Sequence, residues 1–440
     1  MNWTSLLSSQ RIGQAKPSTV PSRSVFEQDY DRIIFSHPFR RLQDKTQVHP
    51  LPEHDFVHTR LTHSLEVSSV GRSLGKKVGE TILQRHAELH DYSAFDIGAI
   101  VAAASLAHDL GNPPFGHAGE DSISDFFAHH PVGQSFRQKV GEAEWIDLTK
   151  FEGNAQGFRI LNKDYYQGLR LSYATLGAFT KYPCPAKFDQ RDRKKKSQKK
   201  YGFFQTEAAL FAQVAKELDL PAVGNHVWSR HPLAFLVEAA DDICYSIIDL
   251  EDGCRLGLVS YDSTVELLAS ILKEDFSKEK LSRVVGQNEQ IGVLRAMVIG
   301  RLIDECSKVF LDAEKDILDG KFDTALTDLC ESAGQLRNIA GVSIEKIYRA
   351  RHVVEIEAAG HEVLPGLLEE FVQAAGFVGV NPVPKKFENL LRLLPAEIKS
   401  ELNQAASEYE RLRSIIDFVS GLTDRHALSL YRKIKGIALS

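Results

Sequence analysis

Apolar residues recur at helical spacing along most of this chain, and this pattern constrains the fold more than any other feature. Spacings of three and four residues place apolar side chains on one face of an α-helix. Alternating Val, Ile and Thr patterns between turn residues, which would indicate strands, are hard to find. The helical pattern is clearest in residues 61–83, 95–110, 233–250, 294–310 and 402–419. We therefore expect an all-α fold.

The composition is that of an ordinary globular protein without a membrane span. Of the 440 residues, 43% are hydrophobic and 25% are charged, which is enough to bury a core. The formal net charge is -6, so bulk charge does not attract nucleic acid or an anionic membrane. The five cysteines form no CxxC pair, and neither a signal peptide nor an 18-residue apolar run is found. We expect a cytoplasmic protein that holds any polyanionic ligand with local cations or metal.

A candidate metal site begins with His108 and Asp109. These residues end an Ala-rich apolar helix, which Gly111 and the pair Pro113-Pro114 stop. Adjacent helical residues lie about 100° apart, so both side chains can flank an ion at the helix end. The dipeptide alone is a weak signal, and it gains weight from acids and histidines elsewhere in the chain.

Two further candidate ligands lie in other predicted helices. His63 belongs to the amphipathic RLTHSLEV, and Asp241 and Asp242 lie inside the apolar EAADDICYSIIDLED. A buried carboxylate needs a partner, and a metal ion supplies one. Asp241 shares one face with Tyr245 and Asp249, whereas its neighbour Asp242 points about 100° away. We choose Asp241 as the ligand; the alternative is that both Asp residues pair with Arg or Lys across a helix interface.

Two imidazoles and two carboxylates make a mixed site suited to Mg, Mn, Fe, Co or Zn, with open positions for water and a phosphate oxygen. Such an ion can generate a nucleophilic hydroxide and neutralise charge on a phosphoryl group. His117 and Glu120 follow at i and i+3 in GHAGE. We predict an acid/base pair in which Glu120 holds the imidazole tautomer of His117, and His117 either transfers a proton or attacks in line with the leaving group. The alternative is charge decoration at a helix N-terminus.

Six motifs resemble, in this order, those of the dGTP triphosphohydrolase family in the HD-domain superfamily: PFRRLQDKTQV, RLTHSLEV, HDLGNPPFGHAGE, FEGNAQGFRIL, TKYP and EAADDICYSIIDLED. The resemblance spans residues 24–257 and resumes in SGLTDRHALSLYRKIKG near the C-terminus. It implies an HD-domain helical core with additional C-terminal helices. It also implies hydrolysis of a deoxynucleoside triphosphate at the α-phosphate, giving a deoxynucleoside and tripolyphosphate. Mg or Mn is the implied metal, with Fe, Co, Ni and Zn as alternatives.

The resemblance also implies roles for individual residues. The implied metal ligands are those that the residues themselves suggest, namely His63, His108, Asp109 and Asp241, and the implied catalytic pair is His117 and Glu120. Contacts to the base, sugar or phosphates are implied for Gln47, Arg60, Asn154, Lys181 and Tyr182. Tyr245 and Asp249 are implied to hold the deoxyribose, since a ring beneath C2′ excludes a 2′-hydroxyl and a carboxylate accepts from the 3′-OH. The chain departs from HDLGH at Asn112, which cannot shuttle protons.

Three regions are expected: an N-terminal segment over residues 1–30, an HD-domain catalytic core over 31–260, and a C-terminal helical region over 261–440 packed on the core. The basic stretch RDRKKKSQKK, residues 191–200, has no apolar periodicity. We interpret it as a solvated loop. The alternative is a nucleic-acid contact, because clustered Lys and Arg release counterions from phosphates.

Two other functions are compatible with the same motifs. A nucleotidase or phosphodiesterase of the HD type would share the metal ligands, but Gln47, Tyr245 and Asp249 argue against it. A nucleotide- or single-stranded-DNA-binding regulator would keep the fold with little turnover, but intact His117 and Glu120 argue against an inactive enzyme. The resemblance implies a homo-oligomer, a tetramer or hexamer, with single-stranded DNA or a dNTP as candidate effector.

Overall fold

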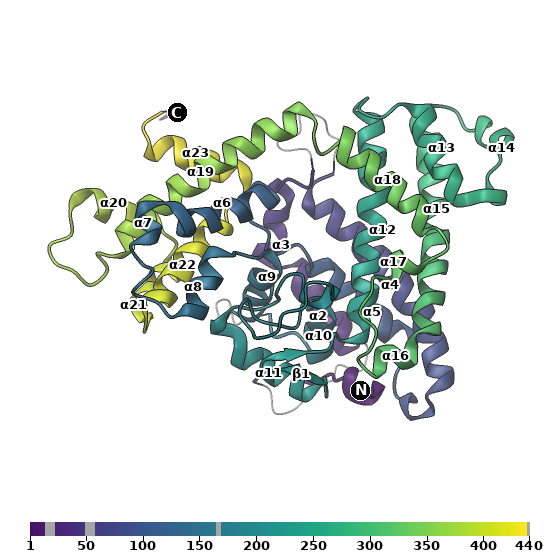
Figure 1. Cartoon of the computed structure of the whole chain (residues 1–440), viewed down its shortest axis with the longest axis horizontal. Helices are drawn as coiled ribbons and strands as arrows, with labels where there is room; N and C mark the ends of the chain where they lie inside the picture. Colours follow the sequence, from purple (N-terminus) through teal and green to yellow (C-terminus); the bar gives the residue numbers. More distant parts are fainter. Residues whose placement is uncertain (14–22, 49–57, 164–168, 438–440) are drawn as a thin grey trace.

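The computed structural model describes residues 1–13, 23–48, 58–163 and 169–437, and helices dominate this part of the chain (Figure 1). Within these ranges the strands are limited to the short antiparallel pair β1, Ala222–Gly224, and β2, Val227–Trp228. The all-α prediction is confirmed. Residues 14–22 of the predicted N-terminal segment lie outside the described residues. No helix among the described residues is long and apolar enough to cross a membrane.

The first part of the chain supplies the helices that carry the predicted motifs. In chain order they are α1 Trp3–Leu6, α2 Val25–Ile34, α3 His37–Arg41, η1 Leu42–Asp44, α4 Arg60–Arg85, η2 Ala87–Leu89, α5 Ala94–Ala107, α6 Gly116–His129, α7 Pro131–Gln134, α8 Glu142–Thr149, α9 Gly153–Asn162, α10 Tyr173–Phe179, η4 Lys196–Gln198, η5 Gln205–Glu207, α11 Ala208–Glu217 and α12 Pro232–Arg255.

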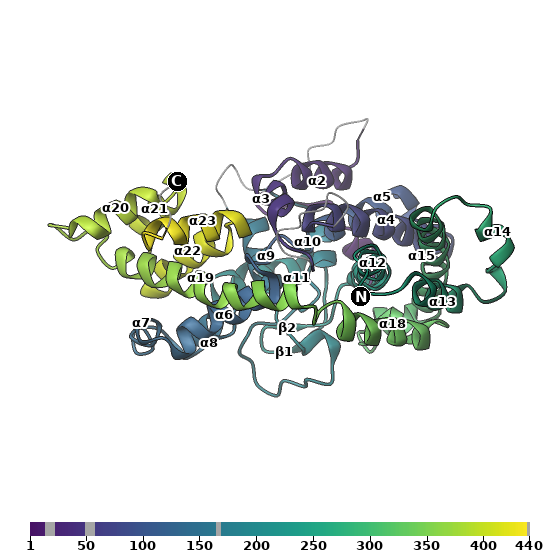
Figure 2. The ribbon, with the colours of Figure 1, turned by 90° about the horizontal axis from the view of Figure 1, so that it is seen from above.

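The helices of the later part divide between the two ends of the molecule (Figure 1). They are α13 Tyr261–Leu272, η6 Lys273–Asp275, α14 Lys278–Ser282, α15 Gln287–Asp312, α16 Glu314–Leu318, α17 Leu326–Leu329, α18 Ala333–Lys346, α19 Arg351–Ala375, α20 Lys385–Leu393, α21 Ala396–Gln404, α22 Glu408–Ser420 and α23 Asp424–Ile434. Figure 2 shows α19 running from the group α20–α23 toward α18.

Close packing of α4 on α5 brings two of the predicted metal ligands together. Three glycines of α4 face α5, and a Cβ at Gly71 would lie 2.4 Å from the Ser105 Oγ atom. A Cβ at Gly75 would lie 2.9 Å from a methyl carbon of Val101. Because these positions lack side chains, the two helices approach closely along the length between them. His63 near the start of α4 therefore faces His108 at the end of α5.

Two hydrophobic clusters form the interior, and the C-terminal half contributes to both. The first joins α4, α5 and α12 with α13, α15 and α18. The second joins α6 and α8 with α19, α21 and α22. The division of the chain at residue 260 stays a prediction. The apolar stretch 402–419 is two helices, because Ser407 caps α22 by accepting a hydrogen bond from the backbone N–H of Glu410.

Candidate active site

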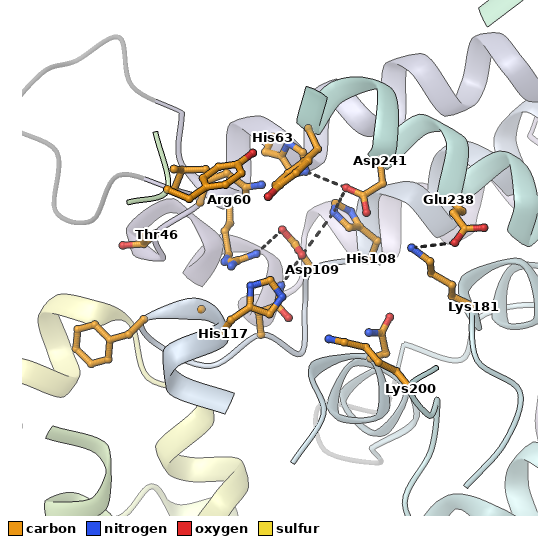
Figure 3. A pocket seen from close by; sticks show the side chains of 18 of the residues that line it. Thr46, Arg60, His63, His108, Asp109, His117, Lys181, Lys200, Glu238 and Asp241 are labelled. Carbon is orange, nitrogen blue, oxygen red and sulfur yellow. Dashed lines mark hydrogen bonds and ion pairs between the residues drawn. The ribbon is translucent and has the colours of Figure 1, made fainter. Parts of the chain in front are cut away.

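A cavity of about 490 Å³ opens where α4, α12, the α5–α6 turn and the start of α6 meet. Most of the predicted site residues line it, although they come from segments far apart in the sequence (Figure 3). Two of them, Glu120 and Asp249, do not line it. The residues that do are Gln47, Arg60, His63, His108, Asp109, His117, Asn154, Lys181, Tyr182, Asp241 and Tyr245.

The four predicted metal ligands lie together at one wall of this cavity. The Nε2 atom of His63 is 3.3 Å from the Oδ1 atom of Asp241. The Nε2 atom of His108 is 3.5 Å from Oδ1 of Asp109 and 3.5 Å from Oδ1 of Asp241. One ligand atom each from His63, His108 and Asp109 lies within 4.8 Å of the others. Figure 3 shows Asp241 approaching the two imidazoles from α12.

This donor set fits a divalent metal ion. The backbone carbonyl of Ser105 lies 2.7 Å from Nδ1 of His108, an arrangement that fixes the ring and directs Nε2 at the cluster. Burial opposes ionisation of Asp241, but the imidazole of His108, together with His63 and Lys181, holds the pKa of its carboxyl well below the usual range. Asp109 is likewise held at a low pKa against the effect of burial, chiefly by Arg60. The two carboxylates are thus ionised at neutral pH and lie beside the two imidazoles as candidate ligands.

Asp242 lies apart from the cluster, as its helix position predicted. The Thr327 hydroxyl of α17 donates to Oδ2 of Asp242 over 2.7 Å, and Asp242 does not line the cavity. Its neighbour Asp241 faces the imidazoles. The structure therefore separates the two acids in the way that the 100° rotation between adjacent helical residues requires.

Asp109 is held by two donors that also face the cavity. Arg60 Nη1 donates to its Oδ2 atom over 2.7 Å, and the Asn112 side-chain amide donates to its Oδ1 atom. Arg60 is buried, and its Nε atom has no hydrogen-bond partner among the described residues. The guanidinium therefore orients a metal ligand and places a positive charge at the cavity wall.

His117 and Glu120 occupy the first turns of α6, but they do not contact each other in the expected way. Glu120 is buried, and its Oε1 atom accepts from the backbone N–H of Gly153 over 2.6 Å. Its Oε2 atom lies 3.6 Å from the Lys200 ammonium. The structure places no hydrogen bond between His117 and Glu120, because these partners at the start of α9 and in the basic stretch occupy the carboxylate. Burial, followed by Lys200 and Arg60, lowers the pKa of His117.

The basic stretch 191–200 is only partly the solvated loop that we expected. Its second half packs inward: Gln198 is buried, and Ser197 donates backbone and side-chain hydrogen bonds of 2.9 Å to Asp323. Lys200 lines the cavity, with its ammonium 3.2 Å from Glu152. The prediction failed there because a lysine paired with buried acids looks, in sequence, the same as one in solvent.

Further cations and polar groups face the cavity from the opposite wall. The Lys181 ammonium lies 3.3 Å from Glu238, which Arg230 also binds over 2.8 Å. Asn154 donates to Glu152 over 2.7 Å. Tyr182 is buried beside Lys181. Gln47 also lines the cavity, and its side-chain oxygen is buried without a hydrogen-bond partner among the described residues.

Tyr348 is a cavity residue that sequence reasoning missed. Its ring stacks on that of Tyr245, with centroids 5.4 Å apart and planes at 25°, and its hydroxyl donates to Asp249 over 2.8 Å. Asp249 is buried behind this pair and does not line the cavity. Tyr348 follows α18 in a region without a recognisable motif, and nothing in its local sequence signals the contact. For Asp249 to contact a ligand as expected, the Tyr348 side chain would have to move and break its hydrogen bond to Asp249.

The buried carboxyl of Asp249 should make the stability of the protein depend on pH. Burial, opposed by the Tyr348 hydroxyl, raises the pKa of Asp249 to about 8, whereas an unfolded Asp has a pKa near 3.9. Between these values the folded state binds more protons, so the free energy of unfolding falls as pH rises, by at most about 1.4 kcal/mol per unit. Asp249→Asn should flatten this dependence in urea unfolding curves recorded with EDTA. An unchanged slope would contradict the burial of an ionisable group there.

Comparison with known proteins identifies two domains and several relatives. Residues 60–152 match the HD domain, and residues 328–433 match the phosphohydrolase-associated domain. A "deoxyguanosinetriphosphate triphosphohydrolase-like protein" of Synechocystis is 42% identical over the full length of both chains. A protein of the same name from Pseudomonas aeruginosa is 38% identical over 99% of each chain. The "deoxyguanosinetriphosphate triphosphohydrolase" of Salmonella paratyphi A is 31% identical over 94% of each.

Proposed function

The chain belongs to the deoxyguanosinetriphosphate triphosphohydrolase family of HD-domain hydrolases, and on this premise we propose that it converts dGTP, and other dNTPs, to the deoxynucleoside and inorganic tripolyphosphate. One observation carries the proposal. A cluster of two imidazoles and two carboxylates lies in the same cavity as several cations, so a metal ion and a triphosphate can be bound side by side. The cations are Arg60, Lys181 and Lys200.

The proposed metal ligands are His63, His108, Asp109 and Asp241, and the proposed metal is Mg or Mn, with Fe, Co, Ni and Zn as alternatives. When bound, such an ion supplies Lewis-acid chemistry toward a phosphate oxygen. The other roles in the proposed reaction fall to side chains that line the cavity. Arg60, Lys181 and Lys200 neutralise the triphosphate, with Asn154 and Tyr182 beside them. Asp109 gains its orientation from Arg60.

His117 is the group assigned to proton transfer at the α-phosphate. Its lowered pKa keeps the imidazole neutral, so it can accept a proton from the attacking water. Oxygen from this water joins the α-phosphorus, the bond from phosphorus to O5′ breaks, and the deoxynucleoside leaves with a proton on O5′. Glu120 is assigned a supporting role, since it fixes the start of α9 and Lys200 beside the reacting groups.

A panel of nucleotides tests the proposed reaction. Purified protein is incubated with each dNTP and with GTP, in Mg or Mn, and the phosphate products are separated. We expect tripolyphosphate from dNTPs and none from GTP. Orthophosphate or pyrophosphate as the sole phosphate product would show that the site catalyses a different phosphohydrolase reaction. If no product forms even with single-stranded DNA or a second dNTP present, the result would favour a nucleotide- or single-stranded-DNA-binding regulator.

Tyr245 should set the preference for deoxyribose. Its half-exposed ring, backed by Tyr348, forms a flat wall of the cavity, against which we place C2′ of the sugar. Tyr245→Ala should lower the ratio of kcat/KM for dGTP over GTP by about tenfold or more, because steric exclusion of one small group is lost. Tyr245→Phe keeps the ring and should keep the ratio. Equal ratios in wild type and Tyr245→Ala would remove Tyr245 from sugar recognition.

We also propose a cytoplasmic homo-oligomer, a tetramer or hexamer, whose activity single-stranded DNA or a dNTP can stimulate. This part of the proposal is supported by the family resemblance of the motifs and by the composition. Light scattering of the purified protein, and kinetics with and without each effector, test it.

A further inference from the structure

Two buried ionisable side chains, Lys45 and Asp424, join three segments of the chain at the edge of the cavity. Only 4% of Lys45 and 1% of Asp424 is exposed, and neither lines the cavity. Lys45 follows η1, and Asp424 is the first residue of α23 near the other end of the chain. The joined segments are residues 45–47, 112–116 and 420–424. Each of the first two contains residues that line the cavity.

Asp424 uses both carboxylate oxygens to hold two of these segments. Its Oδ1 atom accepts from the backbone N–H of Phe115 over 3.1 Å. Its Oδ2 atom accepts from the backbone N–H of Thr46 over 3.0 Å and also from the Thr46 hydroxyl. Phe115 has φ of 65°, a left-handed conformation that a residue with a side chain rarely adopts. The carboxylate thus holds a strained turn from which His117 projects, and it holds the neighbour of Gln47.

Lys45 joins the turn at residues 112–116 to residue 420 at the start of the third segment. Its ammonium donates to the backbone carbonyl of Asn112 over 2.5 Å and to that of Ser420 over 2.9 Å. Its own carbonyl accepts from the backbone N–H of Arg60, the first residue of α4, over 3.2 Å. Burying this amino group is costly, and burial lowers the pKa of Lys45 to about 7 against the attraction of the Asp424 carboxylate. The Lys45 side chain therefore ties the turn at Asn112 to Ser420, whereas Arg60 is held by the Lys45 backbone.

We propose that Lys45 and Asp424 are positioning residues. Through them, residues 420–424 fix the positions of Gln47 and His117 in the cavity. The inference rests on the proposed function, because it assigns the two side chains to the same reaction. Neither touches the substrate. The Lys45 side chain acts through Asn112, and Asp424 acts through Thr46 and Phe115.

Asp424→Asn tests the proposal, because an amide has one acceptor oxygen and cannot serve both Thr46 and Phe115. We expect kcat/KM for dGTP to fall by about 10- to 100-fold, the usual effect of losing a hydrogen bond to a charged group. Arg425→Ala is the matched control. Its guanidinium pairs with Asp44 on the surface, one residue away along α23, and the variant should keep wild-type kinetics.

A double-mutant cycle with Gln47→Ala separates an effect of Asp424 on the position of Gln47 from a general loss of structure. Binding of a dGTP analogue with a methylene group in place of O5′ is measured by calorimetry in Mn. If Asp424 acts through Gln47, Asp424→Asn should weaken binding in the Gln47→Ala background by less than about twofold, since coupled residues are not additive. Fully multiplicative losses, or wild-type kinetics in Asp424→Asn, would overturn the proposal.

Two further measurements keep these outcomes decisive. Circular dichroism shows whether Asp424→Asn folds; if it does not, Thr46→Val, which removes a hydroxyl donor to Asp424, takes its place in the same cycle with the same expectation. The wild type is measured first. A wild type that neither binds the analogue nor hydrolyses dGTP refutes the proposed function, whereas an active wild type with unaffected variants refutes only the positioning role.

Discussion

Asp241→Ala is expected to abolish metal binding and to lower kcat/KM by at least about a thousandfold, since losing even an outer partner of a ligand costs roughly 10- to 100-fold. The carboxylate of Asp241 lies within 3.5 Å of both imidazoles, so its removal leaves the cluster one anion short. Metal content after dialysis against Mn, measured by mass spectrometry, tests the assignment without reference to activity.

Asp242→Ala is the matched control for this change, because it removes the adjacent acid from the same helix. Asp242 bonds to Thr327 and lies outside the cavity, so this variant should bind metal like the wild type and lose at most some stability. Equal metal content in Asp241→Ala and the wild type would contradict the ligand assignment. Loss of metal from Asp242→Ala alone would instead assign the ligand role to Asp242.

His117→Ala is expected to lower kcat by about a hundredfold to ten-thousandfold with metal content unchanged, the range that a positioned proton-transfer group supplies. The lowered pKa of His117 predicts that the wild-type rate falls only at pH values below the ordinary imidazole range near 6.5, and that this acid limb disappears in the variant. Stopped assays of dGTP hydrolysis across pH measure both effects.

His129→Ala controls for a lost imidazole on the same helix. His129 lies at the exposed end of α6 with its Nε2 atom 3.8 Å from Asp125, and its removal should leave the pH profile unchanged. A wild-type kcat in His117→Ala would show that another group moves the proton. A parallel loss of metal would show instead that His117 supports the cluster.

The helices and the metal cluster were predictable because each depends on local patterns. Apolar spacing located α4, α5 and α12, and the 100° step between neighbours separated Asp241 from Asp242. Turn residues placed the end of α5 at Asp109, two residues beyond its observed end at Ala107. The break between α21 and α22 was not predicted, because Ser407 acts as a cap only when the backbone leaves the helical conformation there.

The contacts that involve the later part of the chain could not be predicted in the same way. Tyr348 reaches Asp249 across 99 residues, and Asp424 reaches Thr46 across 378. Such pairs depend on tertiary packing, which no spacing rule records. The burial of Lys200 was not predicted for a related reason. Its acidic partner Glu152 lies 48 residues away, so the local sequence shows a lysine without the carboxylate that pairs with it.

Hydrolysis of dGTP in water enriched in ¹⁸O, with Mn present, tests the central claim most directly. Attack at the α-phosphorus with cleavage of its bond to O5′ places one labelled oxygen in tripolyphosphate and none in deoxyguanosine, and mass spectrometry of both products should show this. Label in orthophosphate or pyrophosphate, with dGDP or dGMP as the other product, would contradict the account, because the metal cluster and cations would then act at a different phosphorus.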